Sequence, residues 1–327
     1  MTRKQRKQSY WRLVWKQFRR DRVAVAGLIL VILLFVIAVF APVIANDRPL
    51  IVSVEGHIQF PIINNMVNTD WNDMVESRGG WVIWPPVRYG PTQIDLGAHL
   101  MPPGKLHLLG TDDRGRDVMA RMIHGTRISL SVGFVAVSIY TVIGVFLGAL
   151  AGFYGGRVDV IISRLIEVMM CFPTFFLILA VLAFLPPSIY NIMVVLGLTS
   201  WTGVARLVRG EFLKQRKIEY VSAAKVVGAS DLRIIFYHIL PNSLAPVLVS
   251  ATFGIAGAIL IESSLAYLGF GVPPPAPSWG EILSQSKQYI DFAWWLTVFP
   301  GFAIFLTVTA YNLVGEGLRD AVDPRLK

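Results

Sequence analysis

The chain has 327 residues, of which 54% are hydrophobic and only 16% are charged, and its mean hydropathy is +0.57. This composition excludes a disordered chain and argues against an ordinary soluble domain, so it predicts an integral membrane protein. The formal net charge of +9 does not indicate nucleic-acid binding, because residues 1–22 hold nine Lys or Arg residues against Asp21 alone. A basic segment directly before an apolar run is typical of a cytoplasmic flank attracted by anionic lipid. We therefore expect a basic cytoplasmic arm and a lipid membrane as a partner, but no nucleic acid.

A helix needs about 20 mainly apolar residues to cross the hydrocarbon core of a bilayer. The first apolar run is too long for a cleavable signal, so we expect it to remain as a transmembrane helix. Basic residues gather in the turns on the same side as the arm, which places both termini in the cytoplasm and residues 45–127 outside it. The runs that qualify as spans are residues 23–44, 128–153, 166–185, 190–208, 244–268 and 292–314.

Residues 45–127, the outer segment, are too polar to span a membrane and too long for a passive connector. The segment contains Trp71, Trp81 and Trp84 together with several prolines, which predicts an ordered lid of turns and extended pieces. Two interpretations of these tryptophans remain open. The favoured one is that they form a small core or lie at the membrane interface, and the other is that they contact a soluble partner or the substrate.

A polar stretch, residues 219–242, interrupts the apolar runs. Small side chains precede Gly228, which is the residue type that enters the left-handed conformation most easily, so the stretch predicts two short helices joined by a bend. Ser230 and Asp231 are suited to cap the second helix, and Pro241 is expected to mark its end. Without a partner, this stretch would be only a solvated helical hairpin between two spans.

The same stretch resembles the EAA loop of ATP-binding-cassette importer permeases, because its small residues, its glycine and its Leu-Pro pair stand at that loop's spacing. Ser222 stands where the family pattern has Glu, so no role of that carboxylate is carried over. The resemblance implies that residues 209–242, the polar loop, couple the chain to a cytoplasmic ATPase. The coupling residues that it indicates are Ser222, Ala223, Ala224, Gly228, Ala229, Ser230, Asp231, Leu240 and Pro241.

Further stretches resemble the oligopeptide and dipeptide importer permeases of the subunit type lettered C. They are LGTDDRGRDVMARMIHGTRISL (109–130), FYGGRVDVIISRLIEVMMCFP (153–173), ESSLAYLGFGVPPPAPSWGEIL (262–283) and NLVGEGLRDAVDPRLK (312–327). The outer stretches IANDRPLIV and GGWVIWPPVRYG are most similar to the branch associated with uptake of peptides and of peptide antibiotics of the microcin C type. The resemblance implies an all-α polytopic membrane protein, the transmembrane domain of a type I importer, in a bacterial cytoplasmic membrane.

The family also implies partners and a mechanism. They are a second homologous permease, two cytoplasmic ATPases and an extracytoplasmic peptide-binding protein, with transport by alternating access. ATP and Mg²⁺ would be bound by the ATPases, because this chain has no G-x-x-x-x-G-K-[ST] motif. The chain also lacks H-E-x-x-H and G-x-S-x-G, and its five histidines are scattered, so we expect no metal, cofactor or catalytic residue in it. Cys171 is its single cysteine, which excludes a disulfide within one chain.

A charged side chain inside a span is costly and therefore informative. Glu262, followed by Ser263 and Ser264, is the candidate for the translocation path or for an interhelical contact. The equally weighted alternative is an interfacial residue near the outer end of the fifth span. A rival function, a stand-alone secondary transporter or channel, would need ligands for a coupling ion, and Glu262 is the one obvious ionisable candidate in the spans.

Two smaller features also carry expectations. Gly144, Gly148, Gly152 and Gly155 follow a four- and three-residue spacing, which favours close packing of the second span against another helix. Arg164 and Glu167 lie three residues apart, which favours an ion pair on one helical face. The expected layout is a basic arm (1–22), a first span (23–44), the extracytoplasmic segment (45–127), a transmembrane core (128–318) carrying the coupling loop (209–242), and a cytoplasmic tail (319–327).

Overall fold

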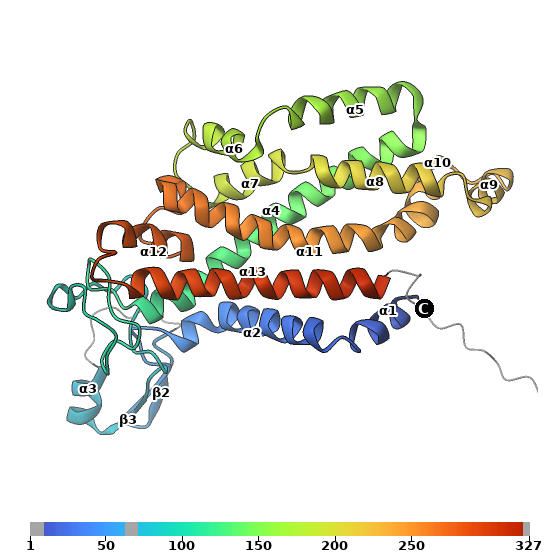
Figure 1. The fold of residues 1–327 in the computed structure, drawn as a ribbon. Helices are drawn as coiled ribbons and strands as arrows, with labels where there is room; N and C mark the ends of the chain where they lie inside the picture. Colours follow the sequence, from blue (N-terminus) through green and yellow to red (C-terminus); the bar gives the residue numbers. More distant parts are fainter. Residues whose placement is uncertain (1–9, 63–70, 323–327) are drawn as a thin grey trace, which may run out of the picture. The chain divides into compact units, whose positions relative to one another are not determined.

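The computed structural model describes residues 10–62 and 71–322 (Figure 1). The chain divides into two compact units. The first unit comprises Met1–Val31, Val132–Ile261 and Thr307–Lys327, and the second comprises Ile32–Ser131 and Glu262–Leu306. Helices make up most of the described residues, which confirms the predicted all-α class, and one small sheet is added to them.

The structure gives the following bounds. The helices are α1 (Tyr10–Phe18), α2 (Arg22–Ile44), α3 (Trp71–Arg78), α4 (Val118–Tyr154), α5 (Gly156–Met170), α6 (Thr174–Leu182), α7 (Ile189–Thr199), α8 (Thr202–Gln215), α9 (Glu219–Val226), α10 (Asp231–Arg233), α11 (Leu240–Leu265), α12 (Trp279–Gln285) and α13 (Trp295–Val322). The strands are β1 (Ile51–Val54), β2 (His57–Gln59) and β3 (Gly80–Ile83). Short 3-10 or π-helical segments are η1 (Leu96–Ala98), η2 (Ile234–Ile239), η3 (Ala266–Phe270) and η4 (Ser286–Gln288).

Five helices in the described residues are long and apolar enough to cross a membrane, and a bent pair can supply a sixth crossing. The five are Arg22–Ile44, Val118–Tyr154, Ile189–Gln215, Asp231–Phe270 and Trp295–Val322. The prediction of about six membrane spans therefore agrees with the fold.

The third predicted span, 166–185, is wrong as a single helix. It comprises the end of α5 and all of α6, which meet at an angle of 78°. Pro173 lies at the break, where it has no N–H to donate and where it disfavours a helical conformation in the residue before it. Cys171 lies at the same break and is exposed. The Arg164–Glu167 pair is confirmed, with 2.6 Å between Nη1 and Oε2.

The second span begins at Val118, ten residues before the predicted start at residue 128. Its first turns contain Arg121 and His124, and because these residues are polar, a hydropathy pattern does not include these turns in the span. Arg121 is fully buried, and the ring of His124 contacts the carbonyl oxygen of Ala45 at 2.8 Å. The helix therefore accommodates polar residues because each has a partner within the second unit.

In the first unit, α4 packs closely on α8 along its glycines. A Cβ atom on Gly148 would lie 2.5 Å from the carbonyl oxygen of Ala205, and one on Gly152 would lie 2.5 Å from Cβ of Phe212. Gly144 meets Val204 in the same way. The expectation of close helix packing is confirmed for these three glycines. Gly155 differs, because it follows the end of α4 with a φ of +67° and lies beside the guanidinium group of Arg216.

In the second unit, β1 is the central strand of an antiparallel sheet of order β2-β1-β3. Helix α3 covers one face of the sheet, where Val52, Val54 and Trp71 form a small core with Trp84 at its edge. Trp81 lies elsewhere and is 47% exposed. The small-core interpretation is confirmed for Trp71 and Trp84, and the described part of the outer segment is ordered as predicted.

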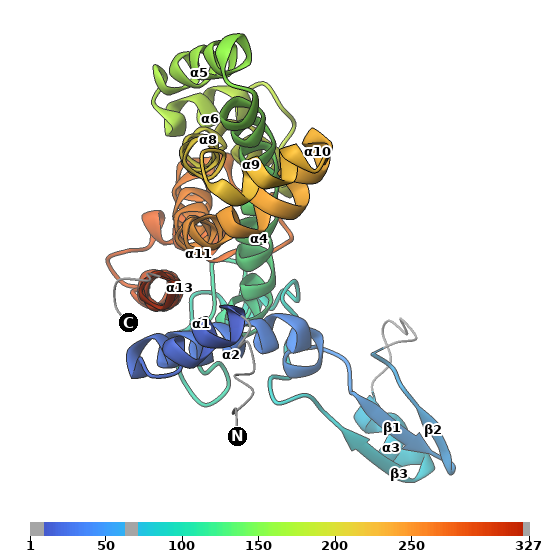
Figure 2. The same ribbon diagram turned by 90° about the vertical axis from the view of Figure 1, so that its right-hand side faces the viewer.

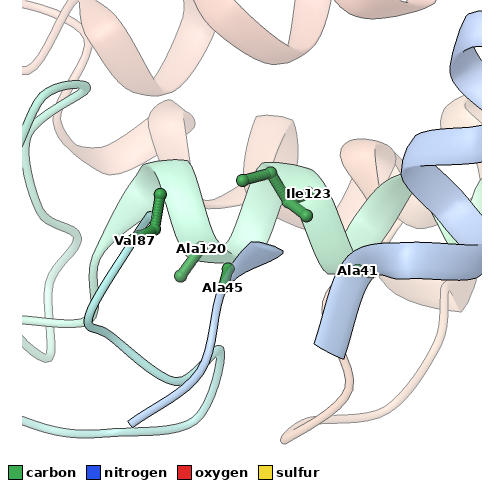
Figure 3. Close-up of a cluster of buried hydrophobic side chains, with 5 residues drawn as sticks. All are labelled: Ala41, Ala45, Val87, Ala120 and Ile123. Atoms are coloured by element: carbon green, nitrogen blue, oxygen red, sulfur yellow. The ribbon is translucent and has the colours of Figure 1, made fainter. Parts of the chain in front are cut away.

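A second cluster fastens the outer segment to the end of α2 (Figure 3). Ala41 and Ala45 at the end of α2 pack with Ala120 and Ile123 at the start of α4, and Val87 closes the cluster. The small alanine side chains let these backbones approach, and Val87 pairs with Ala45 in a parallel bridge. The end of α2 and the start of α4 are thus held together in this unit.

Candidate functional site

The polar loop contains the short helix α9, which ends in a Schellman motif. The N–H of Ala229 donates to the carbonyl of Ala224 at 3.0 Å, and the N–H of Gly228 donates to the carbonyl of Lys225 at 2.9 Å. Gly228 has a φ of +84°, the left-handed conformation that this motif requires and that a Cβ atom disfavours. The predicted bend at Gly228 is therefore confirmed.

The second helix of the loop differs from its prediction. Ser230 is the N-cap residue by conformation, but the described hydrogen bonds include none from its side chain to the first turn of the helix. Asp231 stands in the first turn, where a negative charge suits the helix dipole. The expectation of side-chain capping by Ser230 is thus wrong, although the helix begins where it was predicted.

Pro241 does not end this helix, which continues through the π-helical segment η2 into α11. In η2 the N–H of Leu240 donates to the carbonyl of Ile235, five residues earlier rather than four. A π-turn widens the helix and moves carbonyl groups away from a following proline ring, which would clash in a regular α-helix. The sequence pattern predicts that the helix ends at Pro241, because no signal in the sequence indicates the π-turn.

The loop exposes apolar side chains that sequence reasoning missed. Val226 is 88% exposed and Val227 is 87% exposed, directly before Gly228. Beyond the bend, Leu232, Phe236 and Tyr237 are exposed and line an open hollow with Arg233 and His238. The four-residue spacing of Leu232 and Phe236 was the available signal, but it is as typical of a packed helix face as of a docking face.

The predicted coupling residues lie in three places, of which Ser230 and Asp231 at the start of α10 are described above. Ser222, Ala223 and Gly228 are exposed on α9 and its end, with Ala224 and Ala229 half-buried. Leu240 and Pro241 lie in the continuous helix beyond η2, so the structure gives them a place in the span rather than on the short helix. Ser222, which replaces the family's Glu, is exposed and therefore needs no buried partner.

Contacts of α9, and of Arg216 just before it, join this part of the loop to the rest of the first unit. Val221 is fully buried under the helix, and the hydroxyl of Tyr220 donates to Oε1 of Gln215 at 2.6 Å. Nη1 of Arg216 donates to the carbonyls of Gly152 and Phe153 at 3.3 and 3.2 Å, at the end of α4. The ammonium group of Lys225 lies 5.5 Å from the centre of the Phe153 ring.

A side-chain ion pair joins the neighbouring helices α5 and α8. Arg209 donates through Nε and Nη2 to the two oxygens of Asp159, with 2.8 Å between Nη2 and Oδ2. Two parallel hydrogen bonds fix the relative orientation of the planar groups as well as their distance. This ion pair holds α5 to α8 with a defined geometry.

The candidate residues of the translocation path lie near the end of α11, in the second unit. Glu262 is fully buried, Ser263 is 5% exposed, and Ser264 is exposed. The hydroxyl of Ser263 lies 3.4 Å from Oε2 of Glu262. Ser278, the N-cap residue of α12, and Glu281 in the first turn of that helix are further polar neighbours of this carboxyl. Gly280 packs directly on the backbone of Ser263. In this conformation α12 encloses Glu262, and a role in transport stays a prediction.

A buried charged network was also missed by sequence reasoning. Asp112 is fully buried and accepts hydrogen bonds from Nε of Arg116 at 2.8 Å and from Arg121. Arg121 in turn pairs with Glu281 and donates to Oε1 of Gln285 at 3.0 Å, both on α12. This network explains the DDRGRD stretch as the tie between the outer segment, α4 and α12. Nothing in its sequence spacing indicated the residues of α12 as partners.

Comparison with known proteins gives consistent matches. The family described as "Binding-protein-dependent transport system inner membrane component" matches residues 144–327, and the "N-terminal TM domain of oligopeptide transport permease C" matches residues 9–59. The dipeptide transport system permease protein DppC of Alkalihalophilus pseudofirmus is 37% identical, over 98% of this chain and 91% of its own. The inner membrane ABC transporter permease protein YejE of Escherichia coli is 36% identical, over 95% of this chain and 96% of its own.

One solved structure supports the fold. A chain of the MetNI methionine ABC transporter, in an inward-facing conformation, is matched with a TM-score of 0.52 at 18% identity. The match covers 63% of this chain and 97% of that chain. At this identity the likeness establishes a shared fold and carries no statement about substrate.

Proposed function

The chain belongs to the family of binding-protein-dependent transport system inner membrane components, and from this premise we propose that its polar loop couples it to an ATPase. The chain is a permease of the ATP-binding-cassette importer class, as the sequence resemblance predicted. The matches lend no support to the rival function, a stand-alone secondary transporter or channel. The proposal concerns what the permease carries, what it contacts, and which residues make the contact.

The proposed cargo is peptides or peptide-like compounds, moved across a bacterial cytoplasmic membrane by alternating access. Similarity to a dipeptide transport permease, and the match to a domain of oligopeptide transport permeases, support this class of substrate. The proposed partners are a second homologous permease, two ATPases that bind ATP and Mg²⁺, and an extracytoplasmic peptide-binding protein. Both termini of the chain are proposed to lie in the cytoplasm.

One observation carries the assignment of the polar loop. Val226 and Val227 are almost fully exposed at the end of a helix whose other end is anchored in the first unit by Val221. Two adjacent valines exposed in a polar stretch are unfavourable in water, and contact with a partner removes that cost. The end of α9 is therefore the part of the loop that we expect to enter a groove of an ATPase.

The contacts of α9 indicate how force would pass from the ATPase to the permease. Arg216 and Lys225 link the loop to the end of α4, and the second helix of the loop is continuous with α11. When the ATPases close, α9 would move with them and would displace α4 and α11. ATP can drive this change only if the two conformations of the permease bind the closed ATPase pair with different affinity.

The test is the double substitution Val226→Asp and Val227→Asp in the assembled transporter. Because both side chains are exposed, the fold of the permease should be retained, while two carboxylates at the contact should release the ATPases. The measurements are retention of the ATPase subunits in mild detergent and peptide uptake with ATP turnover in reconstituted vesicles. All three are expected to fall together.

The matched control is Leu96→Asp, because Leu96 is 80% exposed in the outer segment, in the other unit. It should leave retention of the ATPases unchanged. If the double variant keeps the ATPases and its ATP turnover, the end of α9 is not the coupling contact. If uptake of peptides is absent in the unaltered transporter while ATPase coupling is intact, the substrate class is wrong and the coupling proposal stands.

A further inference from the structure

The small sheet of the outer segment has one covered face and one apolar face that remains exposed. Side chains alternate along a strand, so Val52 and its partner Val82 point to the core beneath α3. Ser53 pairs with Ile58 on one side and with Trp81 on the other, and these three side chains occupy the opposite face. The face of the sheet opposite α3 is therefore apolar at both edge strands, through Ile58 on β2 and Trp81 on β3.

The exposed fractions on this face are high. Ile58 is 60% exposed, Trp81 is 47% exposed, and Ile83, which pairs with Ile51, is 45% exposed. Phe60, two residues after Ile58, is 45% exposed. We call Ile58, Phe60, Trp81 and Ile83 the apolar sheet face. In a polar segment that does not span the membrane, such a face is expected to be covered.

Backbone hydrogen bonds tie the sheet directly to the end of a membrane span. The N–H of Val87 donates to the carbonyl of Ile44, the last residue of α2, at 3.0 Å, and the N–H of Asn46 donates to the carbonyl of Val87 at 3.1 Å. The N–H of Leu50 donates to the carbonyl of Ile83 in β3 at 2.8 Å. The short connection between α2 and β1 is thus held by backbone hydrogen bonds near both of its ends.

The half of α2 in the same unit has an exposed apolar surface. Its apolar side chains are exposed over successive turns, at Leu33, Val36, Val39, Phe40 and Val43. In a helix of this length and composition, that exposure indicates contact with acyl chains. The apolar sheet face thus follows a surface that meets the bilayer.

We propose that the apolar sheet face rests on the surface of the lipid bilayer beside the end of α2. The interfacial layer extends about 5–8 Å beyond the hydrocarbon core on each side, and tryptophan is enriched there because its ring is apolar and its N–H is polar. In Figure 1, α3 lies on the side of the strands away from α2, and in Figure 2 the strands lie between the viewer and α3. The face of the sheet that α3 leaves uncovered is therefore on the same side as α2.

The polarity of α3 agrees with this orientation. Its exposed residues include Asp73, Glu76 and Arg78, which would face water while the opposite side of the sheet meets lipid. A soluble partner would more readily bind a surface of mixed polarity than an apolar surface continuous with a span. The sheet is thus a support that holds the outer segment at a fixed height over the membrane, a role independent of the coupling proposed above.

The test uses spin labels on single cysteines in the assembled transporter, in bilayers of phosphatidylethanolamine and phosphatidylglycerol. Cys171 is replaced by serine, and a cysteine is introduced as Ile58→Cys, with Ile83→Cys as a second variant in case the first is poorly folded. Accessibility is measured to oxygen, which concentrates in lipid, and to a water-soluble nickel chelate. The matched control is Glu76→Cys on α3, which is exposed on the opposite side of the sheet.

We expect the label at Ile58 or Ile83 to be reached by oxygen and protected from nickel, and the label at Glu76 to show the reverse ratio. Equal access of nickel to both faces would overturn the proposal. Protection of the apolar sheet face from both reagents would also overturn it, because a protein contact would then be the cover. Protection that arises only after the binding protein is added would assign the face to that protein instead.

Discussion

The polar loop and the outer segment distribute charged and apolar side chains in opposite ways. In the polar loop, Val226 and Val227 are exposed at a helix end, although the surrounding sequence is polar. In the outer segment, Asp112 and Arg121 are fully buried, although the surrounding stretch looks like a solvated turn. A buried ion pair holds elements of one chain together, whereas an exposed apolar pair is available to another chain. The difference separates a region built for internal rigidity from one built for contact.

The largest expected effect is a loss of stability when the buried ion-pair network of the outer segment is broken. Arg121→Met leaves the Asp112 carboxylate buried with one cationic partner fewer, and leaves Glu281 without its pairing arginine. Removing one partner of a buried ion pair costs about 3–5 kcal/mol, so the thermal unfolding midpoint of the purified transporter should fall by several degrees. The measurement is a thermal unfolding curve in detergent.

Arg164→Met is the control for that substitution. Its ion pair with Glu167 is short, but the two side chains are 75% and 59% exposed. Solvent screens such a pair, so the midpoint should stay within the scatter of repeated measurements. Equal shifts for the two variants would mean that burial does not distinguish the network at Arg121.

An intermediate effect is expected at the bend of the polar loop. Gly228→Val places a β-branched side chain at a φ of +84°, which costs on the order of 1–2 kcal/mol and turns the end of α9 away from its position. Uptake and substrate-stimulated ATP turnover should both fall in reconstituted vesicles. The stability of the permease should fall by no more than this backbone strain, because a Cβ atom there meets no other atom within 4 Å.

Gly156→Val separates backbone strain from coupling. Gly156 has a φ of +52°, and a Cβ atom there also meets no described atom within 4 Å, but it stands at the start of α5 rather than in the loop. Because Gly156 is the first residue of α5 and lies outside the polar loop, a comparable strain is expected, with transport less affected than by Gly228→Val. Should the two variants lose uptake equally, strain in the first unit, and not the contact surface, explains the loss.

The smallest effect is expected where the loop meets α4. Lys225→Met keeps the apolar stem of the side chain but removes the cation 5.5 Å from the Phe153 ring. An exposed cation–π contact contributes roughly 0.5–1 kcal/mol, so a slight drop in the unfolding midpoint and a partial loss of uptake are expected. Lys214→Met on α8 is the control and should have no effect on uptake. A full loss of uptake for Lys225→Met would show that Lys225 touches the partner directly.

The sequence by itself determined the membrane class, the approximate positions of the spans and the bend at Gly228. These features depend on local chemistry: apolar runs long enough for a bilayer, and a glycine at a left-handed position after small residues. The four-residue glycine spacing in α4 was likewise a local pattern, and it correctly indicated close packing. Family membership followed from motifs that are contiguous in the sequence.

Only the tertiary structure decided which polar residues are interior and which apolar residues are exposed. Arg121 is separated from Glu281 by 160 positions, so no local period indicates their pairing. The π-turn before Pro241 depends on how the backbone relieves the clash with the proline ring. The break at Pro173 depends on how two short helices pack. A hydropathy pattern indicates neither of these features. Burial results from which elements meet, and that is a property of the folded chain rather than of any one stretch of it.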